Sequence, residues 1–195
     1  MKGALYIIVD VSGSMNEMGK IHLQRNLCRY VTQLRLIEQD RYSGLDIRFY
    51  QWAQNVSEVP LQGDGDIPAL NAQGSSSLSV LSDFLSEDKM NAENSKILIL
   101  SDGNFDRDDY QAFLKWKENH ALPMARTVAV GADADLLKLK KISTNNTVYL
   151  SENIASAIDS TIFGSDEPLT PPASIAQILQ SSQAATEEPE ENWDA

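Results

Sequence analysis

The sequence lacks the paired cysteines of disulfide-linked proteins and the long apolar runs of membrane-spanning ones. Its one cysteine, Cys28, cannot form a disulfide within the chain, and we expect it on a helix as a small residue of the core. The longest apolar runs have the length of a strand, far short of the roughly 20 residues that cross a bilayer. The start of the sequence leads almost at once into an apolar strand and lacks a signal-peptide pattern. These absences favour a cytoplasmic protein without a membrane anchor.

Signatures of catalysis are also scarce. The two histidines are His22, which lies off the apolar face of a predicted helix, and His120, which lies at the far end of another. Neither position suits a general base. The sequence contains no glycine-rich dinucleotide motif, no P-loop and no Gly-x-Ser-x-Gly. We therefore expect a protein that is not an enzyme.

Positive charge is in short supply. Lys and Arg number 16 against 28 Asp and Glu, which gives a formal net charge of −12. This balance argues against nucleic acid or an anionic membrane as the main partner. The segment 165–195 holds seven Asp or Glu, no Lys or Arg, and many Pro, Ser and Gln residues. We expect a domain at 1–164 and a largely flexible acidic tail at 165–195, with a short helix at 173–182.

Apolar patterns predict strands and helices in alternation. Strands are expected at 4–9, 45–52, 56–59, 96–100, 126–131 and 147–150, and helices within 20–39, 78–85, 105–120, 136–142 and 154–162. The apolar face of the first helix is predicted to contain Leu23, Leu27, Tyr30, Val31, Leu34 and Ile37. Strands 45–52 and 56–59 are close enough for a hairpin. The pattern predicts an α/β fold with a doubly wound, mostly parallel six-stranded sheet, one antiparallel edge strand and helices on both faces.

Oxygen-bearing side chains follow two of the predicted buried strands. Asp10, Ser12 and Ser14 come directly after strand 4–9, and Asp102 follows strand 96–100. Alternate residues of an extended segment point the same way, so the first three side chains can direct their oxygens at one point. In open parallel sheets, sites form at the carboxyl ends of the strands, so both carboxylates are expected at one edge. Ligands that are all oxygen suit a hard divalent cation such as Mg²⁺.

These motifs resemble those of the von Willebrand factor type A family over residues 3–164. The resemblance rests on Asp-x-Ser-x-Ser at 10–14, Ser-Asp-Gly at 101–103, and a strand with its glycine at 128–131. It implies a metal-ion-dependent adhesion site in which Ser12 and Ser14 bind the ion directly, while Asp10 and Asp102 bind it through waters.

The family also supplies a threonine from a third loop, before a helix. The matching stretch here is Gly74-Ser75-Ser76-Ser77-Leu78, which has no threonine. The resemblance implies Ser76 as the fifth metal residue, because Leu or Ile often stands two residues after the family's threonine. Ser75 and Ser77 remain alternatives.

The family resemblance implies a metal-dependent protein–protein interaction module. Its ion would be Mg²⁺, with Mn²⁺ or Ca²⁺ as substitutes, and an open coordination position would accept an Asp or Glu of the partner. Stand-alone bacterial members of the family imply an adapter in a cytoplasmic stress or defence system, with a kinase, phosphatase or ATPase as partner.

Two alternatives to this interpretation stay open. One is a Mg²⁺-dependent phosphohydrolase or phosphoacceptor enzyme on a similar sheet, which would need more carboxylates and a lysine near the metal. Lys20 is the nearest lysine in the sequence. The other is an adapter that binds through its tail and whose metal is purely structural.

Overall fold

The structure, a computed structural model, describes residues 3–164 apart from 64, 88–89, 91–94 and 121–122. Its strands are β1 (Gly3–Asp10), β2 (Leu45–Trp52), β3 (Val56–Glu58), β4 (Ser95–Ser101), β5 (Met124–Ala129) and β6 (Val148–Leu150). Its α-helices are α1 (Lys20–Ile37), α2 (Leu78–Leu85), α3 (Arg107–Asn119), α4 (Leu136–Ile142) and α5 (Ile154–Phe163). The predicted tail and its helix at 173–182 lie outside the described residues, so the division of the chain at residue 164 stays a prediction.

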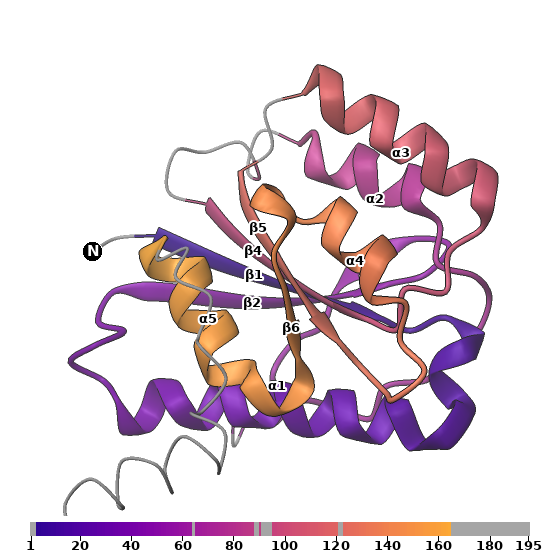
Figure 1. Ribbon diagram of the computed structural model, residues 1–195. Coiled ribbons are helices and arrows are strands. Elements are labelled where there is room, and N and C mark those ends of the chain that lie inside the picture. Colours follow the sequence, from indigo (N-terminus) through magenta and orange to yellow (C-terminus); the bar gives the residue numbers. More distant parts are fainter. Residues whose placement is uncertain (1–2, 64, 88–89, 91–94, 121–122, 165–195) are drawn as a thin grey trace, which may run out of the picture. The chain divides into compact units, whose positions relative to one another are not determined.

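The strands form one sheet in the order β3-β2-β1-β4-β5-β6 (Figure 1). The pairs β1–β2, β1–β4, β4–β5 and β5–β6 are parallel, and β3 pairs antiparallel with β2 at one edge. The order of elements confirms the predicted fold class. Strands β1 and β4 lie at the centre, where helices cover both faces, which explains why both are continuous apolar runs.

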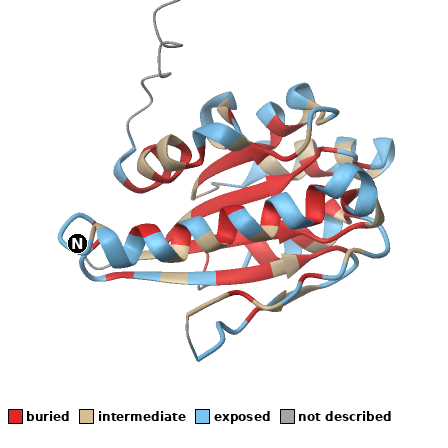
Figure 2. Ribbon diagram, turned by 90° about the horizontal axis from the view of Figure 1, so that it is seen from below, coloured by how far each residue is buried: buried red, intermediate tan, exposed pale blue. Residues whose placement is uncertain are grey.

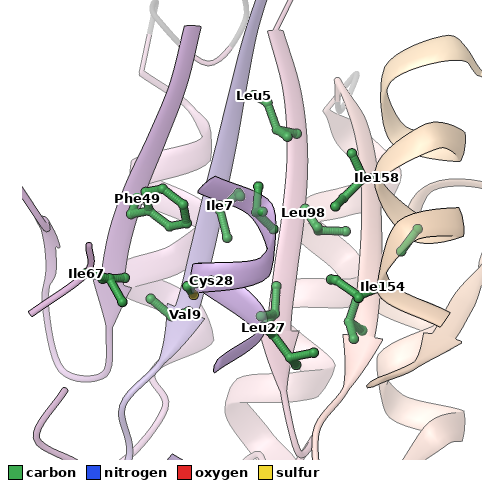
Figure 3. Packing of buried hydrophobic residues seen from close by; sticks show 14 of the residues in the cluster. Leu5, Ile7, Val9, Leu27, Cys28, Phe49, Ile67, Leu98, Ile154 and Ile158 are labelled. Atoms are coloured by element: carbon green, nitrogen blue, oxygen red, sulfur yellow. The ribbon is translucent and has the colours of Figure 1, made fainter. Parts of the chain in front are cut away.

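Two apolar cores lie on opposite faces of the sheet. On one face, Leu5, Ile7 and Val9 of β1 belong to a cluster with residues of α1 and α5, which Figure 3 shows in part. On the other face, Tyr6 and Ile8 pack in a cluster with residues of α2, α3 and α4. Side chains alternate across a strand, so one strand feeds both cores. No helix in the described part of the chain is long and apolar enough to span a membrane.

The first helix confirms one prediction and corrects another. Cys28 is fully buried in the core, as expected (Figure 3). Leu23, Tyr30 and Ile37, however, are 37%, 38% and 80% exposed, so the predicted apolar face was partly wrong. The buried face of α1 consists of Lys20, Ile21, Gln24, Leu27, Cys28, Val31 and Leu34. This face is rotated from the predicted stripe because the first turns of α1 bury polar side chains. Apolar periodicity predicts such polar positions to be exposed. Figure 2 shows buried and exposed positions alternating along α1.

Candidate metal centre

The two predicted metal carboxylates lie where parallel strands end. Asp10 is the last residue of β1, and Asp102 directly follows Ser101, the last residue of β4. Because β1 and β4 are neighbouring parallel strands, both carboxylates lie at the same edge of the sheet, as the sequence predicted.

Backbone hydrogen bonds fix the loop at 60–77 against the loop that follows β1. Gly13 N donates to Gly74 O at 2.9 Å, and Gln73 N donates to Val11 O at 2.8 Å. The first and third predicted motifs are therefore held in a fixed register.

Asp10 is the hub of the site. Its side chain is fully buried and accepts hydrogen bonds from Ser12 N (2.9 Å), Ser76 Oγ (2.9 Å) and Ser101 Oγ (2.6 Å). Burial raises the pKa of Asp10 above its ordinary value, and the hydrogen bonds from Ser101, Ser12 and Ser76 oppose that shift. A cation beside this carboxylate would offset part of the cost of burying its charge.

The two serines of the first motif lie side by side. Ser12 Oγ and Ser14 Oγ are 3.1 Å apart, a distance at which either hydroxyl can donate to the other. Oxygens at neighbouring corners of a magnesium octahedron, each about 2.1 Å from the ion, lie about 3.0 Å apart. The same arrangement therefore fits two neighbouring metal ligands.

The three serines of the third loop have different surroundings. Ser76 is 4% exposed and donates to Asp10. Ser75 is exposed, and the Ser77 hydroxyl caps α2 by accepting from Val80 N at 3.3 Å. Of the three candidates, Ser76 is thus the one whose hydroxyl is hydrogen-bonded to the Asp10 carboxylate. Its role as a ligand stays a prediction, as do those of the other four residues.

Asp102 has different partners from Asp10. Its Oδ2 accepts from Lys20 Nζ at 2.8 Å, and its Oδ1 accepts from Asn104 N at 3.0 Å. Lys20 Nζ also donates to Asp133 Oδ2 at 2.9 Å. Burial alone would lower the pKa of Lys20, but its bonds to Asp102 and Asp133 raise that pKa above its ordinary value. The bond from Lys20 in turn lowers the pKa of Asp133.

Four residues at the site were missing from the predicted metal set: Gln24, Ser101, Lys20 and Asp133. Gln24 Nε2 donates to Asp10 O at 2.9 Å. Ser101 belongs to the Ser-Asp-Gly motif, and Lys20 is the lysine closest in sequence to the Asp-x-Ser-x-Ser motif. No sequence signal pointed to Gln24, one helical turn after Lys20, or to Asp133.

The side chains present fit a hard divalent cation. Among the residues that the structure describes, no group of three or more His, Cys, Asp or Glu side chains is placed to hold a metal ion, so serine hydroxyls would have to complete the ligand set. A hydroxyl that donates its hydrogen to Asp10 keeps its oxygen lone pairs for a cation. Gln24 Oε1 is a buried oxygen without a hydrogen-bond partner in the described structure, and a water on a hydrated ion could satisfy it.

Comparison with known proteins bears on the fold. No family model and no curated protein matches the sequence. Among solved structures, the ArnB paralog VWA2 from Sulfolobus acidocaldarius superposes with a TM-score of 0.62 at 17% identity, over 83% of this chain and 46% of that one. A von Willebrand factor type A structure from Catenulispora acidiphila gives a TM-score of 0.55 at 15% identity, over 83% and 42%. The chain has the fold of a von Willebrand factor type A domain.

A third structure of this fold contains a metal. Proximal thread matrix protein 1 from the mussel byssus, described with a zinc-occupied MIDAS motif, gives a TM-score of 0.53 at 12% identity, over 80% of this chain and 45% of that one. The chain spans less than half the length of each of the three proteins. At these identities the comparisons establish the von Willebrand factor type A fold.

Proposed function

We propose that the protein is a metal-dependent protein–protein interaction module. The observation that carries this proposal is the convergence on Asp10: hydroxyls from the third loop and from the end of β4 donate to one buried carboxylate, and the two serines of the first motif lie beside it. In the proposed site Asp10, Ser12, Ser14, Ser76 and Asp102 hold Mg²⁺.

The chain's own side chains leave the ligand shell incomplete. Mg²⁺ strongly prefers six oxygens, and three neutral hydroxyls with two carboxylates that act through waters do not supply them all. When bound, the ion would supply a Lewis-acidic position that accepts an Asp or Glu carboxylate from the partner.

Exposed residues around this edge would set the specificity. Glu17 and Met18 on the first loop are exposed, Met18 by 81%, and so is Asn104 after β4. A flexible apolar Met beside polar residues suits contact with a protein surface. Phe105, in contrast, is 4% exposed and belongs to the core, so it does not contribute to such a surface.

The cellular setting is part of the proposal. We place the module in the cytoplasm as an adapter of a bacterial stress or defence system, with a kinase, phosphatase or ATPase as partner. The net charge of −12 supports a protein partner over nucleic acid or an anionic membrane.

The test combines metal titration with partner capture. Isothermal titration with MgCl₂ or MnCl₂ should show binding that is lost in the double variant Ser12→Ala/Ser14→Ala and kept in Ser79→Ala, an exposed serine on α2. Capture of the partner should follow the same pattern and disappear in EDTA. A partner that stays bound in EDTA would show that the metal does not bridge the two proteins.

A second candidate function is favoured by one observation. Lys20 Nζ lies 2.8 Å from Asp102 and 2.9 Å from Asp133, and a metal-dependent phosphohydrolase or phosphoacceptor enzyme needs such a lysine and extra carboxylates. An aryl-phosphate assay with Mg²⁺ decides between the two. Turnover in the wild type that Asp10→Ala abolishes would favour the enzyme, and no turnover would favour the interaction module.

The tail-mediated adapter is tested by deleting residues 165–195. Capture that survives the deletion favours binding through the metal face.

A further inference from the structure

Lys20 places a permanent positive charge inside the candidate metal centre. Its side chain is 2% exposed, and its ammonium bonds both Asp102, which is 3% exposed, and Asp133, which is 44% exposed. We propose that Lys20 is a built-in counter-cation, which holds Asp102 in position when no metal is bound and lowers the affinity of the site for its metal. This inference rests on the proposed function, because it concerns the same site.

The backbone around Lys20 is shaped to accept it. A Cβ added at Gly131, after β5, would lie 2.6 Å from Lys20 Cδ and 2.8 Å from Asp133 Oδ1. Such distances are too short for any side chain, so the lysine stem passes directly over the glycine backbone. Gly131 also has a φ of +96°, which L side chains rarely adopt. The lysine therefore occupies a built position.

The ammonium of Lys20 supplies a positive charge to the buried Asp102 carboxylate, as a metal ion would. Asp102 is almost fully buried, and a buried carboxylate without a counter-charge is costly. Lys20 supplies that charge from α1, with Asn104 N on the other carboxylate oxygen. Asp102 is thus held in place without a metal, and loss of the ion does not leave Asp102 as an unpaired buried charge.

The same ammonium weakens the attraction for a cation. With Asp10 ionised, the carboxylates of Asp10, Asp102 and Asp133 and the ammonium of Lys20 carry two net negative charges, which match one divalent ion. Without Lys20 there would be three. Asp133 has the opposite effect and strengthens the attraction for a cation, because it shares the ammonium of Lys20. Without Asp133, Lys20 would pair with Asp102 alone.

Two variants with opposite expected effects test the inference. Lys20→Met keeps the apolar stem and removes the charge, and it should bind Mn²⁺ on the order of tenfold more tightly in isothermal titration. Asp133→Asn should bind Mn²⁺ several-fold more weakly. The controls Lys115→Met and Asp40→Asn change the net charge by the same amount as Lys20→Met and Asp133→Asn, respectively, at exposed positions elsewhere. Their affinities for Mn²⁺ should stay near that of the wild type. Lys20→Met should lower the melting temperature relative to the wild type, and the difference should be larger in EDTA than with saturating Mn²⁺.

The outcomes separate this inference from the proposed function. A wild type that binds no Mn²⁺ overturns both. A wild type that binds Mn²⁺ while Lys20→Met binds it no more tightly than Lys115→Met overturns the counter-cation alone. If Lys20→Met fails to fold, Asp133→Asn decides, and an affinity equal to or above that of Asp40→Asn overturns the inference.

Discussion

The hydroxyl of Ser101 should contribute more to stability than any exposed serine of the protein. Ser101 is fully buried; its Oγ donates to Asp10 Oδ2 at 2.6 Å and accepts from Gly103 N at 3.0 Å. Ser101→Ala removes a hydrogen bond to a charged group, worth about 1.5–3 kcal/mol, and leaves a buried N–H unpaired, which costs about 1–3 kcal/mol. Because Asp10 keeps its bonds from Ser12 N and Ser76, we expect a net loss of roughly 2–4 kcal/mol in the free energy of unfolding.

Urea unfolding in EDTA, followed by circular dichroism, measures this loss without any contribution from metal binding. Ser79→Ala, on an exposed position of α2, is the matched control and should change the free energy of unfolding by less than about 0.5 kcal/mol. The variant should also bind divalent metal more weakly, because Asp10 loses one of the groups that orient it. If Ser101→Ala unfolds at the same urea concentration as Ser79→Ala, Ser101 does not support Asp10 as the geometry indicates.

Two further predictions concern the helices around the site. The Asp109 carboxylate of α3 accepts from Leu78 N and Ser79 N at the start of α2, so Asp109→Ala should lower the free energy of unfolding in urea by about 1–2 kcal/mol. An equal effect of Asp108→Ala, on an exposed residue of the same turn, would show that these two bonds to α2 do not contribute to stability. Burial raises the pKa of Cys28 from 9.0 to about 12, so above pH 9 the unfolded thiol ionises while the folded one does not. The wild type should therefore lose up to about 1.4 kcal/mol per pH unit between pH 9 and 11 relative to Cys28→Ala, in parallel unfolding curves, and identical pH profiles would contradict the assigned pKa.

The sequence predicted the sheet well because its signals are local. Strands β1 and β4 are apolar runs that end at Asp10 and just before Asp102, and the alternation with helices implies parallel pairing. Once the strands are parallel neighbours, their carboxyl ends must meet at one edge. The choice of Ser76 among three serines agrees with its contact to Asp10, while metal ligation by all five residues stays a prediction.

The parts that the sequence did not predict depend on pairing over long distances. Lys20 is 82 residues from Asp102 and 113 residues from Asp133 in the chain, so no local pattern links them. The buried face of α1 was misplaced for a related reason. Lys20 and Gln24 are buried because polar groups at the end of the sheet receive them, and apolar periodicity cannot register a polar partner.

The start of α1 has a consequence for protein engineering. Three of its side chains each hold a different part of the site edge: Lys20 holds Asp102, Gln24 holds Asp10 O at the end of β1, and Arg25 Nη2 donates to Ile67 O in the long third loop at 2.9 Å. One helix thus contacts the first two motifs and the loop that leads to the third.

A library intended to change binding specificity should therefore leave these α1 positions untouched. It should randomise the exposed positions around the site, such as Glu17, Met18 and Asn104, which the described structure leaves open to solvent. Such a library would vary the surface that we propose for partner binding and would leave the contacts of α1 with the motifs unchanged.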